Sequence, residues 1–165
     1  MASDHSFDFV CDIDPQEVIN ALDQCKREVG QRYDLKDAQA DMDYEQKNNK
    51  ISIKAKDDYK VRAIIDILKQ KMIKRDISIK ALDISEPERI GGDFCKVTIG
   101  IQQGIDQENA KKITALIKKS NEKVQVQIQG DQLRVVSKKI DALQACIKLV
   151  KSANLPIHVS VKNLR

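Results

Sequence analysis

The feature that most constrains the fold of this chain is an internal duplication. Segments with alternating apolar and polar residues are typical of strands, and segments with apolar residues every three or four positions are typical of amphipathic helices. In the first half they follow each other in the order β-α-β-β-α-β, and the same order returns after Gly92. This is the order of the ferredoxin-like unit, in which two helices cover one face of an antiparallel sheet. The sequence therefore predicts an α+β fold with two ferredoxin-like domains.

Local signals indicate where these elements begin and end. Asp14 and Pro15 are typical of a helix start, because Asp caps free backbone N–H groups and Pro has no N–H to leave free. Gly30 stands where that helix is expected to end. The stretch 86–92, Glu-Pro-Glu-Arg-Ile-Gly-Gly, has the composition of a linker, so we expect it to separate the two copies.

Composition restricts the class of protein. The chain has 165 residues, of which 41% are hydrophobic, enough to form a buried core. No apolar run approaches the roughly 20 residues of a membrane helix, and the N-terminus does not resemble a secretory signal. The four cysteines are far apart, without the C-x-x-C spacing of a metal or redox site, and there are only two histidines. We therefore expect a cytoplasmic protein with reduced thiols and no membrane association, metal or cofactor.

Charge is unevenly distributed along the chain. The net charge is +4, but residues 1–85 hold 15 Lys and Arg against 17 Asp and Glu, a net of −2. Residues 86–165 hold 14 against 8, a net of +6. The second half is therefore the better candidate for contact with phosphate groups. The alternative is that these residues are ordinary solvated faces.

Catalytic motifs are missing from the sequence. It contains no G-x-S-x-G elbow, P-loop, G-x-G-x-x-G or H-E-x-x-H segment. Neither histidine has an obvious Ser or Cys partner that it could activate. Three cysteines fall on apolar faces of predicted elements and are expected in the core: Cys11, Cys25 and Cys146. The sequence therefore predicts a protein that is not an enzyme.

One group of candidate binding residues follows the first helix. Arg32, Tyr33 and Asp34 combine a bidentate donor, a ring that can stack on a base, and a carboxylate that can accept hydrogen bonds from a guanine edge. Aromatic residues make up only 4% of the chain, so the position of this ring is informative. The alternative is that Tyr33 packs against the sheet at the end of the helix.

Other candidates lie in the second half. Lys111 and Lys118 are seven residues apart, as are Lys112 and Lys119, so each pair repeats along one side of a predicted helix. Gln103 and Gly104 join a strand to the start of that helix, where backbone N–H groups suit an anion. Polar residues take the outward positions of the second-half strands: Lys96, Thr98, Gln125, Gln127, Gln129, Arg134, His158, Ser160 and Lys162. These side chains could contact phosphates and base edges, or they form a solvated or inter-domain face.

An RNA-recognition module has the same β-α-β-β-α-β order and reads bases on aromatic side chains of its central strands. The third strands predicted here, 50–54 and 132–136, contain no aromatic residue. Stacking of single-stranded RNA on the sheet is therefore disfavoured.

Four segments resemble the YajQ family of bacterial proteins: Ser-Phe-Asp-Phe-Val at 6–10, Arg-Tyr-Asp-Leu at 32–35, Gln-Gly-Ile-Asp at 103–106, and the long segment 123–135. The resemblance spans nearly the whole chain. It implies that the two ferredoxin-like domains exchange their N-terminal strands. Domain 1 would then comprise 14–85 with strand 94–103, and domain 2 would comprise 104–165 with strand 6–13. Periodicity alone does not predict this exchange.

The resemblance also implies nucleotide binding, with cyclic di-GMP as effector in some members and interplay with transcription regulators. The family tends to have Phe where Tyr33 and Leu35 stand, and Glu where Asp106 stands; Tyr33 keeps a ring and Leu35 does not. We therefore expect a nucleotide-binding protein whose ligand is cyclic di-GMP, GTP or ATP. The alternative is an RNA- or DNA-binding protein that uses the basic second half. The expected nucleotide contacts are Arg32, Tyr33, Asp34, Gln103, Lys111, Lys112, Lys118, Gln127 and Arg134.

Overall fold

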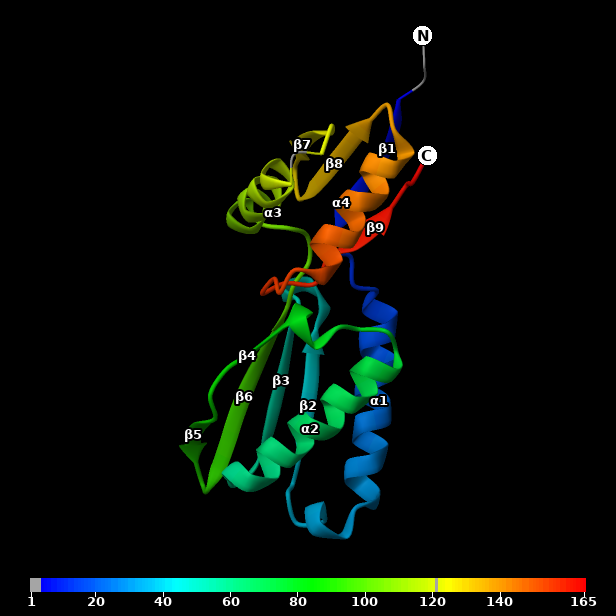
Figure 1. The fold of residues 1–165 in the computed structure, drawn as a ribbon. Coiled ribbons are helices and arrows are strands. Elements are labelled where there is room, and N and C mark those ends of the chain that lie inside the picture. Colours follow the sequence, from blue (N-terminus) through cyan, green and yellow to red (C-terminus); the bar gives the residue numbers. More distant parts are fainter. Residues whose placement is uncertain (1–3, 121) are drawn as a thin grey trace. The chain divides into compact units, whose positions relative to one another are not determined.

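The computed structural model of the chain describes residues 4–120 and 122–165. Within them the protein has the predicted α+β class, with four α-helices and two antiparallel sheets (Figure 1). The helices are α1 (Pro15–Gln31), α2 (Asp58–Lys74), α3 (Gln107–Lys119) and α4 (Ile140–Ser152). The described residues include no helix with the length and apolar character needed to cross a membrane.

The first sheet has four strands in the order β7, β8, β1, β9. Their bounds are β1 (His5–Val10), β7 (Gln125–Gln129), β8 (Gln132–Ser137) and β9 (Ser160–Lys162). The N-terminal strand β1 lies in the middle of this sheet, antiparallel to β8 on one side and to β9 on the other. Helices α3 and α4 cover one face, and the core beneath them includes Phe7 and Phe9, both 0% exposed.

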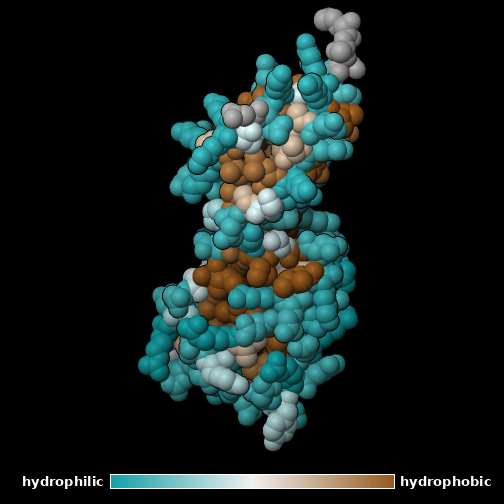
Figure 2. Space-filling view, in the orientation of Figure 1, coloured by the Kyte–Doolittle hydropathy of each residue, from teal (hydrophilic) through white to brown (hydrophobic). Residues whose placement is uncertain are grey.

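The second sheet contains five strands. Four follow the order β2, β3, β6, β4, and β5 also pairs with β6. Their bounds are β2 (Asp41–Glu45), β3 (Lys50–Lys56), β4 (Leu82–Ile84), β5 (Glu88–Gly91) and β6 (Phe94–Ile101). Helices α1 and α2 bury their apolar stripes in the core of this sheet. The face visible in Figure 2 shows hydrophilic side chains over much of the helices and apolar residues mainly between elements.

The chain divides into two compact units, each with its own core. We call Ile13–Gln102 the central unit, and the residues up to Asp12 together with Gln103–Arg165 the terminal unit. Strand β1 precedes α1 in sequence but pairs within the terminal unit. Conversely, β6 precedes α3 but pairs within the central unit. Each sheet therefore contains one inner strand, β1 or β6, that is followed in sequence by a helix of the other unit.

Helix ends follow the chemistry of the capping residues. The Asp14 carboxylate accepts a hydrogen bond from the Gln16 backbone N–H at 3.0 Å, and Pro15 takes the first helical position, as predicted. Asp106 caps α3 in the same way through the Asn109 N–H, also at 3.0 Å. Helix α1 does not stop at Gly30; it runs to Gln31, and the Arg32 N–H closes its last turn by donating to the Glu28 carbonyl.

The expectation of a linker over 86–92 does not fit the structure. Residues 88–91 form β5, which pairs with β6 inside the central unit, and the turn between them has positive φ at Gly91, Gly92 and Asp93. The sequence signal failed for a physical reason. Every residue of β5 is exposed, so the strand has no buried face and no apolar alternation, and its Gly-Gly turn looks like a linker.

All four cysteines are buried and free of disulfide bonds. This confirms the core positions predicted for Cys11, Cys25 and Cys146, and it adds Cys95 in β6. Burial raises the pKa of Cys11 and of Cys146 to about 11 and that of Cys25 to about 12. These three side chains therefore stay as thiols at neutral pH, and a thiol is a poor nucleophile compared with a thiolate.

Candidate functional site

Tyr33 lies at the end of α1, on a single 3-10 turn formed by Tyr33–Leu35. The Tyr33 side chain is 87% exposed, whereas Leu35 is 2% exposed and packs in the core of the central unit. The buried leucine anchors the turn, and the turn presents the tyrosine ring to solvent. The alternative in which Tyr33 packs against the sheet is therefore excluded. Exposure of a large ring on a connection between elements is typical of a binding position.

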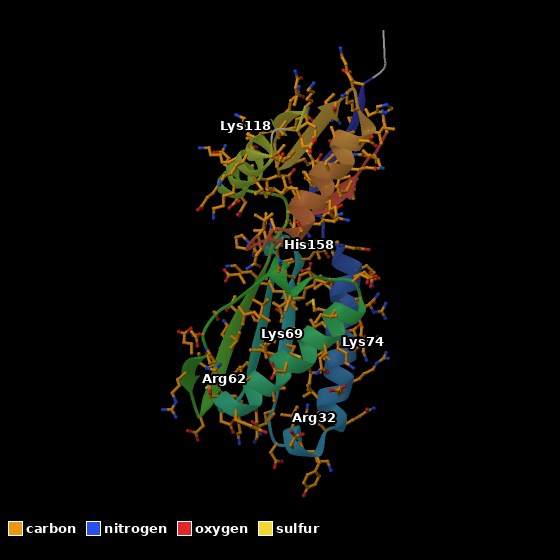
Figure 3. All side chains as sticks on the ribbon, in the orientation of Figure 1. Arg32, Arg62, Lys69, Lys74, Lys118 and His158 are labelled. Atoms are coloured by element: carbon orange, nitrogen blue, oxygen red, sulfur yellow. The ribbon has the colours of Figure 1, made fainter. Side chains whose placement is uncertain are left out.

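Arg32 and Asp34 flank this ring and pair with each other. The Arg32 guanidinium donates from Nε to Asp34 Oδ1 at 3.0 Å and from Nη2 to Oδ2 at 2.7 Å. The hydrogen bonds with Arg32 lower the pKa of Asp34, and they raise the pKa of Arg32. The Nη1 group of Arg32 is not used in this bidentate pair, so it can donate to a phosphate oxygen. Figure 3 labels Arg32 at the end of α1.

Sequence reasoning missed a cation that lies over the Tyr33 ring. The Lys36 ammonium lies 5.7 Å from the centroid of the Tyr33 ring, within the range of a cation–π contact. Tyr59, at the start of α2, provides another aromatic ring of the central unit. Tyr59 is itself 70% exposed. Lys36 follows Tyr33 by three positions, a spacing that could have indicated it; Tyr59 carries no such signal.

A cavity of 450 Å³ lies beside this turn. Leu35, the last residue of the 3-10 turn, and Lys36, the residue after it, both line this cavity. Its lining residues are Lys26, Val29, Gly30, Leu35, Lys36, Gln39, Ala40, Asp41 and Met42. The volume falls within the range of small-molecule sites, and its lining combines an apolar floor with two lysines and one aspartate.

The nine predicted contacts divide between the two units. Arg32, Tyr33 and Asp34 belong to the central unit. The terminal unit holds the others: Gln103, Lys111, Lys112, Lys118, Gln127 and Arg134. The three lysines are exposed on α3, where Figure 3 labels Lys118, and Lys112 pairs with Glu108 at 3.8 Å.

Gln103 and Gly104 form a tightly packed connection. The Gly104 N–H donates to the Cys11 carbonyl at 2.7 Å, its φ is +82°, and a Cβ there would lie 2.6 Å from the side chain of Asp131. Gln103 and Gly104 line a cavity of 200 Å³ together with Asp12, Asp131 and other residues of the terminal unit. These carboxylates disfavour an anion, and Asp106 already caps the helix that begins here. Glycine is needed at position 104 for the close approach of two chain segments.

A row of polar residues crosses the sheet of the terminal unit. In register from one edge to the other are Gln127 on β7, Arg134 on β8, Asp8 on β1 and Lys162 on β9. Asp8 is 1% exposed, yet its carboxylate is satisfied: Arg134 Nε donates to Oδ1 at 3.1 Å and Asn163 Nδ2 donates to Oδ2 at 2.8 Å. Sequence reasoning missed the pair of Asp8 with Arg134. Asp8 is a polar residue in a strand of alternating apolar and polar residues, and an arginine stands in a partner strand, so these two signals could have indicated the pair.

The predicted polar platform of the second half is divided by the fold. Lys96 and Thr98 lie on β6 and therefore in the central unit, because that strand pairs with β3 and β4. His158 precedes β9, which begins only at Ser160. The remaining residues of the predicted platform lie on strands of the terminal unit.

We expect Asp8→Asn to destabilise the protein by about 1.5–3 kcal/mol at pH 7, because hydrogen bonds to a buried charged group are lost or weakened. Burial by itself raises the pKa of Asp8, but hydrogen bonds from Arg134 and Asn163 and the charges of Arg134 and Arg165 hold it below its ordinary value. Because the pKa of Asp8 is lower in the folded state, its ionised carboxylate stabilises the native state at pH values above the unfolded-state pKa, which is near 4. This contribution is lost as the pH falls through the folded-state pKa.

Urea unfolding at pH 7 and at pH 3 measures this effect. The difference in unfolding free energy between the natural protein and Asp8→Asn should shrink at the lower pH. Asp12→Asn is the matched control, because the Asp12 pair with Lys162 is exposed and should contribute less than about 1 kcal/mol. A difference that is the same at both pH values would rule out a stabilising charged Asp8.

The described residues include no group of three or more His, Cys, Asp and Glu side chains that could hold a metal ion. The arrangement around Tyr33 instead combines an exposed ring, two cations and one carboxylate, which are groups that recognise bases and phosphates.

Comparison with known proteins places these features in a family context. A family model described as "Nucleotide-binding protein YajQ-like" matches residues 5–165. A protein of Alkaliphilus oremlandii named nucleotide-binding protein is 47% identical over the full length of both chains. Proteins with the same description from Campylobacter concisus and Chloroherpeton thalassium are 43% and 39% identical, again over the full length of both chains.

Proposed function

This chain belongs to the YajQ family, as its sequence motifs predicted, and we propose that it is a cytoplasmic nucleotide-binding protein without catalytic activity. The observation that carries this proposal is the Tyr33 ring, 87% exposed, with the Lys36 ammonium over it and the paired Arg32 and Asp34 on either side of it in sequence. The printed names of the relatives support nucleotide binding. The raised pKa values of three buried thiols support the absence of a cysteine nucleophile.

The proposed site works by stacking and charge neutralisation. A nucleobase stacks on Tyr33, and Tyr59 is a second exposed ring of the central unit. Phosphate oxygens accept hydrogen bonds from Arg32 and Lys36, and Lys26 adds a further charge in the neighbouring cavity. Leu35, where the family tends to have a ring, is buried here and takes no part in stacking.

Within the class of nucleotides, we propose cyclic di-GMP as the preferred ligand, bound as an effector that changes contact with a regulatory partner protein. Guanine presents two N–H donors on one edge, and a carboxylate can accept from both. Asp34 is such a carboxylate: the hydrogen bonds from Arg32 lower its pKa, and each of its oxygens can accept from guanine as well as from Arg32. GTP and ATP are the ligands against which this preference is to be measured.

Tyr33→Ala is expected to weaken nucleotide binding by roughly 5- to 150-fold, because stacking of a base on an aromatic ring contributes about 1–3 kcal/mol. Tyr33→Phe keeps the ring and should bind almost as the natural protein does. Calorimetric titration with cyclic di-GMP, GTP and ATP measures these affinities. Asp34→Asn should relax the preference for guanine more than it lowers overall affinity.

Ile73→Ala serves as the control for this experiment. Ile73 is an exposed apolar side chain, 55% exposed, at the opposite end of α2 from Tyr59, and its removal should not change affinity. If Tyr33→Ala leaves the affinity of the folded protein unchanged, the proposed site is wrong. Failure of all three nucleotides to bind at high micromolar concentration would remove the function itself.

A second candidate function is binding of RNA or DNA by the terminal unit. The observation that favours it is the exposure of Lys111, Lys112 and Lys118 on α3, in the basic half of the chain. Gln103, Gln127 and Arg134 would then add polar contacts. Such binding must weaken steeply as salt rises, because each phosphate contact releases counterions. Gel shifts at two salt concentrations distinguish it from stacking of a free nucleotide.

We also propose that each unit is a ferredoxin-like domain whose first strand is exchanged. The strand orders β7, β8, β1, β9 and β2, β3, β6, β4 support this proposal. Take β1 as the first strand of the terminal unit, followed by β7, β8 and β9, and β6 as the first strand of the central unit, followed by β2, β3 and β4. In both sheets the first strand then lies between the third and the fourth. The helices α3 and α4, and α1 and α2, then complete a β-α-β-β-α-β unit each.

A further inference from the structure

The strand β7 differs from the other outer strands of the two sheets. An edge strand exposes unpaired backbone groups, and proteins normally protect it with charges, proline or shortness. Strand β2 carries Asp41, Asp43 and Glu45 among its five residues. Strands β9 and β4 have only three residues each, and β5 has four. Strand β7, Gln-Val-Gln-Ile-Gln, has neither charge nor proline.

The outer edge of β7 is open in the described part of the chain. The strand pairs with β8 on one side and ends the order of its sheet on the other. Four of its five residues are exposed, and Val126 packs partly against the core of the terminal unit. Ile128 is 49% exposed, although it shares its sheet face with the fully buried Leu133. An uncovered edge with an exposed isoleucine is a surface that another strand would stabilise.

We propose that β7 pairs antiparallel with β7 of a second copy of this chain, about a two-fold axis at Gln127. The strand is complementary to itself in this register. Gln125 lies opposite Gln129 of the second copy, and Val126 lies opposite Ile128, so each side chain meets one of its own kind. Glutamine amides can both donate and accept, and apolar residues on the helix side cover each other.

The length and sequence of β7 select this register and favour a second copy over an unrelated peptide. Gln-Val-Gln-Ile-Gln reads nearly the same in both directions, so a second β7 matches it position by position. An axis at Gln127 pairs all five residues of the strand, whereas a shift of the axis by one residue keeps like faces together but pairs only three of them. Asp131 takes no part in this pairing, because it lies in the turn between β7 and β8 with its side chain beside Gly104.

The interface formed by one pair of strands is small, so we expect a dimer in equilibrium with the monomer, at about 10–500 µM. A Gln127→Cys substitution tests the geometry directly. Antiparallel neighbours have Cα atoms about 4.5–5.5 Å apart, within the range that a disulfide spans. Mild oxidation should therefore link two copies of Gln127→Cys through residue 127. The four native cysteines are buried and do not compete.

Gln144→Cys is the matched control for crosslinking. Gln144 is exposed on α4 of the same unit, away from any strand edge, and its cysteine variant should remain monomeric under the same oxidation. Crosslinking of both variants at equal rates would mean random collision and would overturn the proposal. Crosslinking of neither would overturn it as well.

Analytical ultracentrifugation of the full-length protein gives the independent measurement. The average mass should rise with concentration, and amides of residues 125–129 should exchange with deuterium more slowly in concentrated samples. Gln127→Lys places two like charges opposite each other at the axis and should weaken dimerisation at least tenfold, while Gln144→Lys should not change it. A protein that stays monomeric up to 1 mM, or a dimer that Gln127→Lys leaves intact, contradicts pairing through β7.

Discussion

A fragment of residues 86–165 is expected not to fold cooperatively, whereas a fragment of residues 13–102 is expected to fold on its own. The first fragment holds α3, α4 and three strands of the terminal unit, but it lacks β1. Because β1 lies between β8 and β9, its absence leaves β9 without a neighbour and removes Phe7 and Phe9 from the core. The second fragment keeps every element of the central unit.

Thermal unfolding followed by circular dichroism compares the two fragments. We expect a sharp transition for 13–102 and a broad, weak one for 86–165. A third chain supplies the control: residues 4–12 joined by a short Gly/Ser linker to residues 103–165 should recover a sharp transition, because it restores the middle strand. A stable, monomeric 86–165 fragment with a sharp transition would count against the role of β1 in the terminal unit.

Phe9→Ala is expected to lower the unfolding free energy by about 3–5 kcal/mol, the range found when a buried phenylalanine is truncated. Phe9 is 0% exposed, and its register partners are Leu133 on β8 and Val161 on β9. Its ring meets that of Phe7 edge to face, with centroids 4.7 Å apart, so the substitution also loses an aromatic contact. This amount is a large fraction of the stability of a unit of this size.

Urea unfolding gives the free energy, and hydrogen exchange locates the effect. Loss of protection should concentrate in β1, β8 and β9. Phe94→Ala is the matched control, because Phe94 is only half-buried at the start of β6 and lies in the central unit. Phe94→Ala should lower the unfolding free energy by clearly less than Phe9→Ala does, and it should speed hydrogen exchange at a different set of amides. Equal costs for the two substitutions would show that Phe9 does not anchor the terminal-unit core.

Periodicity was enough to predict most of the secondary structure. The apolar stripe of α1, from Val18 to Val29, and the alternation in β3 and β6 are strong because one side of each element is buried. The strand β5 was missed because all of its residues are exposed. Alternation also cannot tell which sheet a strand joins, since Cys95, Val97 and Ile99 would bury the same face in either unit. Only the family resemblance suggested that β1 and β6 pair away from their sequence neighbours.

The candidate site was predictable only where its residues are adjacent in sequence. Arg32, Tyr33 and Asp34 could be recognised as a group because they occupy consecutive positions after a helix. Lys36 lies just beyond this group, and only the folded structure places its ammonium over the Tyr33 ring. The outward phase of Arg134 was predicted correctly, but its buried partner Asp8 comes from the far end of the chain.

The position of β1 in the terminal unit has a consequence for synthesis on the ribosome. Translation makes β1 before its partners: β8 follows about 125 residues later and β9 about 150 residues later, so at about 5–20 residues per second the interval is roughly 6–30 s. The central unit is fully synthesised during this interval, since it ends at Gln102. Throughout it the nascent chain carries a hydrophobic segment with Phe7 and Phe9 whose partner strands are not yet made, so we expect the yield of native protein to depend on translation speed.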